Sequence, residues 1–156
     1  MAATKRRFGV TSLLVGGAFA AALAVLGFWL ARPSVPDLSG PALIAAGKMV
    51  YAGHCTECHG GNLEGEPNWR TPYPDGSLPA PPHDASGHTW HHADKVLFGI
   101  IRDGGASVAP KGFPSRMPAF GGQISEREIW AVLAFIKSTW PEEIQKRQEA
   151  VSRRAR

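Results

Sequence analysis

The residues best suited to chemistry are Cys55, Cys58 and His59, which form the pattern C-x-x-C-H. Two thiols at this spacing can add to the two vinyl groups of one haem, giving two thioether bonds, and the histidine that follows can bind the iron. The imidazole must be neutral and held in one tautomer, so its second nitrogen should donate to a backbone carbonyl. The pattern therefore predicts one covalently bound haem c.

Three other uses of the cysteine pair fit the sequence less well. A redox pair of the thioredoxin type would need a strand–helix–strand context, which the sequence lacks. A structural disulfide would close a loop of only four residues and would constrain the chain little. A zinc site would need further ligands, and among nearby residues only His91 and His92 could serve, by coincidence.

An apolar segment near the start of the chain predicts export. Residues 8–31 contain no charge and are long enough to cross a bilayer as one tilted helix. A basic cluster at residues 5–7 precedes them, so the positive-inside rule keeps residues 1–7 in the cytoplasm and exports the rest. A cleaved signal peptide is the alternative, because residues 18–20 and 22–24 resemble cleavage sites. The apolar run is longer than the apolar region of a signal peptide and continues past both possible cleavage sites, which favours an anchor.

The remaining sequence predicts one small all-α domain. Residues 32–39 contain two prolines and are expected to be a stiff linker, and residues 40–140 are expected to be the haem domain. Helices are expected at residues 40–52, at 90–103, and after a capping box formed by Ser125 and Glu128. An apolar stripe should bury this last helix; its members are Ile129, Val132, Leu133 and Ile136.

Two further regions complete the prediction of three or four short helices joined by long loops. Residues 60–88 are rich in glycine and proline and show no periodicity, so a bound cofactor is expected to fill space there. Residues 141–156 are mostly charged and are expected to form a frayed, solvated helical tail. Within residues 40–140 the charges nearly balance, with 8 bases and 9 acids. A nucleic-acid-binding domain should instead carry a positive stripe on the fold itself.

From about residue 40 to 140 the chain resembles the class I mono-haem cytochromes c, of a membrane-anchored bacterial type. The resemblance implies the cytochrome c fold around the haem and a second axial ligand in a proline-adjacent loop before the last helix. Met117, within residues 115–121, fits that ligand. Of the other methionines, Met1 is expected in the cytoplasm and Met49 in the core.

The same resemblance implies contacts that position the haem. Gly47 and Tyr51 on the first helix should meet two residues of the last helix, Trp130 and Ala134. A proline carbonyl should orient His59, with Pro81 or Pro82 as the candidates.

Seven polar or aromatic side chains have two interpretations each. Among the histidines, one could replace Met117 or two could bind copper, but capping, solvent exposure or contact with haem propionates is favoured. These histidines are His83, His88, His91 and His92. The other three side chains could donate to the propionates or only pin the loop. They are Trp69, Arg70 and Tyr73.

His–Met ligation fills both axial positions and raises the reduction potential, which predicts an electron carrier rather than an enzyme. The expected location is the bacterial inner membrane, as a single-pass protein with its haem domain in the periplasm. The expected partners are membrane or periplasmic redox proteins. Two alternatives remain: a haem sensor or peroxidase if Met117 does not bind the iron, or a small anchored haem subunit of a larger oxidase or dehydrogenase.

Overall fold

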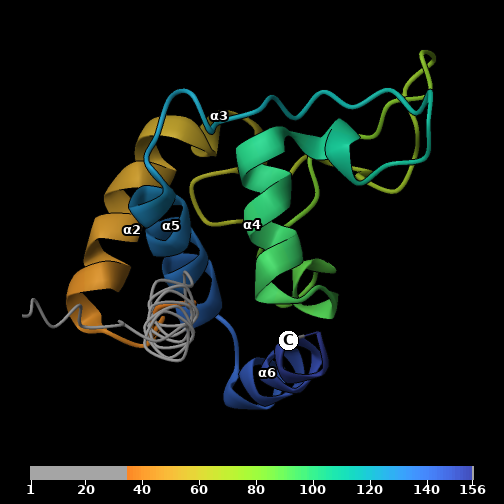
Figure 1. Ribbon diagram of the computed structural model, residues 1–156. Helices are drawn as coiled ribbons and strands as arrows, with labels where there is room; N and C mark the ends of the chain where they lie inside the picture. The colour runs from red at the N-terminus through yellow and green to blue at the C-terminus, as the bar shows by residue number, and fades with distance from the viewer. Residues whose placement is uncertain (1–34, 156) are drawn as a thin grey trace, which may run out of the picture. The chain divides into compact units, whose positions relative to one another are not determined.

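The computed structural model describes residues 35–155. Within this range the chain is all-helical and has no strand, which agrees with the expected all-α class (Figure 1). The α-helices are α2 (Pro41–His54), α3 (Thr56–His59), α4 (Asp94–Asp103), α5 (Glu126–Ser138) and α6 (Glu142–Arg154). Two short 3-10 turns, η1 (Thr89–His91) and η2 (Gly105–Ser107), flank α4.

The predicted cytoplasmic segment 1–7, the predicted anchor 8–31 and residues 32–34 of the predicted linker lie outside the described residues. From residue 35 to 155, no helix is both long and apolar enough to cross a membrane. Residues 35–39 of the linker are not helical, as the two linker prolines, Pro33 and Pro36, predict.

The fold depends on a close crossing of α2 and α5, the two helices that lie side by side in Figure 1. Gly47 lies at the crossing, where a Cβ atom would come within 1.8 Å of the Ala131 carbonyl oxygen and 3.0 Å of the Phe135 Cβ. One turn later, the Tyr51 ring packs on the Phe135 ring with 5.3 Å between centroids. Only a residue without a side chain lets the two backbones approach so closely.

The predicted partners of Gly47 and Tyr51 on α5 are therefore wrong by one residue. Trp130 instead stacks on Phe98 of α4, with 4.5 Å between ring centroids. Because residues four apart share one face of a helix, Ala131 and Phe135 face α2 together. Trp130 is directed to α4, and Figure 1 shows α5 between α2 and α4.

The start of α5 agrees with its prediction. The Ser125 Oγ accepts a hydrogen bond from the Glu128 backbone N–H at 3.3 Å, and the Glu128 carboxylate accepts from the Ser125 N–H at 2.8 Å. This reciprocal capping box satisfies two of the free N–H groups at the helix start. All four residues of the predicted apolar stripe are 2% exposed or less.

Helix α6 corrects the expectation of a frayed tail. Gln148 is fully buried, and its side-chain amide donates to the Asp94 carboxylate at 2.7 Å and to the His92 carbonyl at 3.1 Å. The Ser152 hydroxyl accepts from the Asp94 backbone N–H at 2.9 Å, and Lys137 of α5 pairs with the same carboxylate at 2.7 Å. Polar side chains thus dock α6 against the start of α4, which a search for apolar periodicity does not detect.

Candidate functional site

Cys55 is the residue between α2 and α3, and Cys58 lies within α3 on the same turn of chain. Cys55 ends α2 with its N–H bonded to the Tyr51 carbonyl at 2.9 Å, and its own carbonyl accepts from the His59 N–H at 2.9 Å. Residues three apart on such a turn are neighbours on its surface, so Cys55 and Cys58 point to one side. Both thiols are free.

The thiol chemistry of Cys55 argues against a thiol–disulfide redox pair. Burial, with a smaller contribution from Cys58, raises the pKa of the Cys55 thiol to about 11. Reactive C-x-x-C pairs have a lowered thiol pKa, because the thiolate is the nucleophile. A neutral, partly buried thiol beside an exposed one instead suits permanent attachment to a bound group.

His59 has the tautomer that a metal ligand needs. Its side chain is buried, and its Nδ1 lies 2.9 Å from the Pro81 carbonyl oxygen. A carbonyl only accepts, so Nδ1 carries the proton and Nε2 keeps a free lone pair. Burial is the main cause of the lowered pKa of His59, which keeps the ring neutral at pH 7. Of the two candidate prolines, Pro81 is the one that holds the ring.

The Pro81 carbonyl is held in place by a crossing of two loop segments. Gly65 has a left-handed backbone (φ +67°), and a Cβ there would come within 2.5 Å of the Pro82 nitrogen and 2.6 Å of the Pro81 carbonyl carbon. Next to it, the Glu66 N–H donates to the Ala80 carbonyl at 2.8 Å. The long loop without periodicity is therefore ordered by its own close contacts next to His59.

The Glu66 side chain strengthens the same crossing. Its carboxylate accepts hydrogen bonds from the Ala80 backbone N–H and from the Tyr73 hydroxyl, the latter at 2.9 Å. The bond from Ala80 is the larger cause, and that from Tyr73 the next, of the lowered pKa of Glu66. The ionised carboxylate therefore joins the Pro81 segment to residues 66–73.

We expect the fold to lose stability in acid partly through Glu66. Because the folded-state pKa of this carboxyl is lowered, its stabilising contribution is complete above the ordinary value of 4.5 and is lost as pH falls through the folded-state pKa. The urea midpoint should therefore fall more steeply below pH 4.5 in the natural chain than in Glu66→Gln, which has no charge to protonate. Equal slopes in the two proteins would contradict this role of Glu66.

Of the three loop side chains that could donate to propionates, Tyr73 is engaged by a hydrogen bond and the other two by stacking. The Tyr73 hydroxyl is used by Glu66. The Arg70 guanidinium lies 4.0 Å above the Trp69 ring, which stacks on His88 with 5.4 Å between centroids. For Tyr73 the structure supports the loop-pinning interpretation, and the stacked series Arg70–Trp69–His88 joins the loop to the start of η1.

Trp90 is a candidate donor that the sequence pattern did not single out. Its indole Nε1 is buried and has no hydrogen-bond partner among residues 35–155, although such groups are almost always paired. Trp90 packs on the core cluster that contains Tyr51 and Leu63, close to the His59 turn. A bound group with a carboxylate, as haem has, would supply the acceptor. The residues present thus fit a haem.

The loop that carries Met117 is attached to the end of α4. The Gly105 N–H donates to the Met117 carbonyl at 3.2 Å, and the Phe120 N–H donates to the Ile101 carbonyl at 3.0 Å. The Phe120 ring meets the His54 ring edge to face, with 6.2 Å between centroids. Since His54 directly precedes Cys55, the fold brings the methionine loop beside the cysteine turn.

Arg116 joins the loop that carries Met117 to residues 60–81, which follow the cysteine turn and are called the proximal loop. Its guanidinium pairs with the Asp75 carboxylate at 2.9 Å and lies 4.0 Å above the Tyr73 ring. Tyr73 in turn binds Glu66, which holds the Pro81 segment. We call residues Arg116, Asp75 and Tyr73 the clasp. It connects the segments of the two predicted axial ligands.

Met49 is not a core residue, contrary to the prediction. Its side chain is 74% exposed on α2, whereas Met117 is partly buried. The helix position of Met49 faces away from α5, where Gly47 and Tyr51 make the crossing. Of the two methionines among residues 35–155, Met117 is therefore the partly buried one.

The histidines outside the cysteine turn make varied contacts in the described part of the chain. Between residues 35 and 155, no three or more His, Cys, Asp or Glu side chains are grouped so that they could hold a metal ion. His91 is exposed, and the His88 and His92 rings meet edge to face with 5.5 Å between centroids. His83, in contrast, contacts His59: the two rings are stacked, with 3.9 Å between their centroids.

Comparison with known families gives a match over residues 42–136, to the family described as cytochrome C oxidase, cbb3-type, subunit III. The matched range contains the cysteine turn, the Pro81 segment and the methionine loop. No curated protein and no solved structure matches the chain. The match covers well over half of the 156 residues. The chain therefore belongs to this family, and is a c-type cytochrome of the mono-haem class that carries covalently bound haem and functions in electron transfer.

Proposed function

We propose that the chain is a single-haem electron carrier, with thioether bonds at Cys55 and Cys58 and with His59 and Met117 as the axial ligands of the iron. The observation that carries the proposal is the 2.9 Å contact between His59 Nδ1 and the Pro81 carbonyl, beside two free cysteines. When bound, the haem supplies a one-electron Fe(II)/Fe(III) couple. With both axial positions filled, no site is open for a substrate, which favours a carrier over an enzyme.

The chain's own residues hold the ligands in place. Pro81 fixes the His59 tautomer, and Glu66 and Gly65 hold Pro81. Gly105 holds the backbone of Met117. Since each ligand is attached to ordered segments, little rearrangement should accompany a change of oxidation state.

The location is part of the proposal. We place the haem domain on the periplasmic face of a bacterial inner membrane, anchored by residues 8–31, because these residues are uncharged and follow a basic cluster. Its partners are then other membrane or periplasmic redox proteins. The nearly balanced charge of residues 40–140 implies little electrostatic steering towards them.

A pyridine haemochrome spectrum with an intact mass tests the proposal. The full chain, made in a host that matures c-type cytochromes, should contain one haem, and its spectrum should be that of two thioether bonds. Cys55→Ala and Cys58→Ala should each shift the spectrum to that of one thioether and reduce the yield of holoprotein. A colourless protein with the mass of the bare chain would contradict the proposal.

We expect the clasp to control the exchange of Met117 rather than global stability. The Arg116 and Asp75 side chains are both more than half exposed, so losing the pair should change the free energy of unfolding little. Arg116→Ala should nevertheless let imidazole replace Met117 on the ferric iron several times faster, because the loop loses its link to Tyr73. Arg127→Ala, at an exposed arginine of α5, is the control. Equal rates in the two variants would remove this role.

A second function is favoured by the name of the matched family, which is that of an oxidase subunit. The chain would then be a small haem subunit that passes electrons within a larger complex. Mild detergent extraction followed by size analysis separates the two functions. A carrier should migrate alone, whereas a subunit should migrate with its complex and contain additional haem groups.

A further inference from the structure

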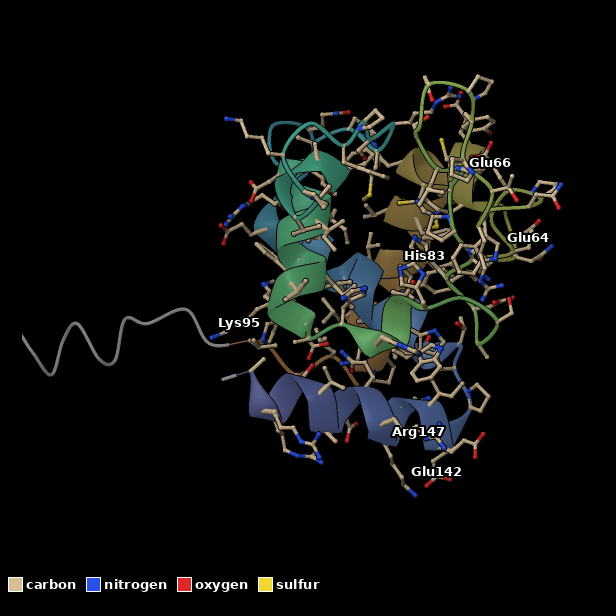
Figure 2. All side chains as sticks on the ribbon, turned by 90° about the vertical axis from the view of Figure 1, so that its right-hand side faces the viewer. Glu64, Glu66, His83, Lys95, Glu142 and Arg147 are labelled. Carbon is tan, nitrogen blue, oxygen red and sulfur yellow. The ribbon has the colours of Figure 1, made fainter. Side chains whose placement is uncertain are left out.

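His83 lies against the face of His59. The two rings are 3.9 Å apart between centroids and inclined by 24°, which is a stacked arrangement. The His83 side chain is partly buried, and its ring and the Tyr51 ring meet edge to face with 6.3 Å between centroids. Figure 2 shows His83 inside the loop region, whereas Glu64 lies at its outer edge.

Both backbone polar groups of His83, its N–H and its carbonyl, are hydrogen-bonded. Its N–H donates to the Leu63 carbonyl at 2.8 Å, in the segment that follows the cysteine turn. Its carbonyl accepts from the indole N–H of Trp140, two residues past the end of α5, at 2.7 Å. His83 is therefore tied to both the proximal loop and the helical core.

The ring of His83 has a tether of its own. Its Nδ1 lies 2.9 Å from the Thr89 hydroxyl oxygen, and Thr89 is buried at the start of η1. Thr89 thus holds one edge of the His83 ring while a face of the ring lies against His59.

The other bonds to His59 leave one motion weakly restrained. The hydrogen bond from Nδ1 to Pro81 and a metal bond at Nε2 both lie in the plane of the imidazole. Neither bond opposes rotation of the ring about the line through its two nitrogens. Only the side-chain torsions of His59 restrain that rotation. A flat group held against one face does oppose such rotation.

We infer that His83 is a positioning residue for the proximal ligand: tethered by Thr89, it sets the plane of the His59 ring. The inference rests on the proposed role of His59 as an axial ligand. The orientation of an axial imidazole determines how its π orbital overlaps the iron d orbitals. His83 should therefore influence the electronic structure of the ferric haem without touching the iron.

Thr89 allows a test with a matched pair of variants. Thr89→Val keeps the shape and removes the tether, while Thr89→Ser keeps the hydroxyl. His83→Leu retains bulk against His59 but has no tether and no flat face. Each holoprotein is examined by ¹H NMR for the hyperfine shifts of the four haem methyl groups in the ferric state, and by redox titration. Haem content and mass of the natural chain are measured first.

Thr89→Val and His83→Leu should both change the spread of the four methyl shifts and broaden them, and Thr89→Ser should reproduce the natural pattern. A natural pattern in His83→Leu, or equal patterns in Thr89→Val and Thr89→Ser, would overturn the inference. A natural chain without covalent haem, or without a histidine on its iron, would instead defeat the proposed function. That result appears before any Thr89 or His83 variant is compared.

Discussion

Met117→Ala should lower the reduction potential by on the order of 0.2 V, because axial ligands set haem potentials over a range of about 0.8 V and a thioether favours Fe(II). The backbone should stay in place, since Gly105 and Ser115 bond to the main chain of residue 117. The vacated position should then bind imidazole, azide or carbon monoxide. Redox titration and ligand-difference spectra measure both effects.

Met49→Ala is the matched control for this experiment. Met49 is 74% exposed on α2, so the same substitution should leave the potential and the methionine–iron charge-transfer band unchanged. If Met117→Ala also kept the natural potential and spectrum, Met117 would not be an iron ligand. The sensor or peroxidase alternative would then regain support, because one axial position would be open in the natural protein.

Gly47→Ala should destabilise the protein by at least about 2 kcal/mol, since overpacking of this kind costs about 1–3 kcal/mol and the clash here is with backbone. A Cβ at residue 47 would lie 1.8 Å from the Ala131 carbonyl oxygen, so α2 and α5 would have to separate. The separation would also displace Tyr51, whose hydroxyl donates to the Gly60 carbonyl at 3.2 Å, beside His59. Urea unfolding of the holoprotein measures the loss.

Gly53→Ala, in the same helix, provides the opposite expectation. Nothing lies within 4 Å of a Cβ at residue 53, so alanine should stabilise α2 by up to about 1 kcal/mol through its higher helix propensity. The two identical substitutions should thus shift the urea midpoint in opposite directions. A loss of similar size in both variants would mean that the crossing at Gly47 is not what stabilises the fold.

Local features of the fold could be predicted well from the sequence. The capping box of Ser125 and Glu128 and the buried stripe that follows it are set by residues within a few positions of each other. The glycine that permits the helix crossing was also expected, but its partner on α5 was misassigned by one residue. The rotation of a helix about its axis depends on what packs against its other faces, as Phe98 does against Trp130.

Polar contacts between distant segments were the least predictable. Gln148 docks α6 through an amide, and Arg116 meets Asp75 across 41 residues of chain. Neither contact produces a hydrophobic period, and either side chain would be as common on a solvated surface. The indole N–H of Trp90, which has no partner within residues 35–155, and the stack of His83 on His59 likewise depend on the path of the loop.

By itself, the sequence determined the class of this protein: C-x-x-C-H at residues 55–59 and an all-helical domain around it, because both follow from spacing along a few turns of chain. Only the tertiary structure decided which carbonyl holds His59, which residues join the methionine loop to the proximal loop, and that α6 is docked. These contacts are made between segments far apart in the chain, where the geometry of loops, rather than local residue preference, selects the partner.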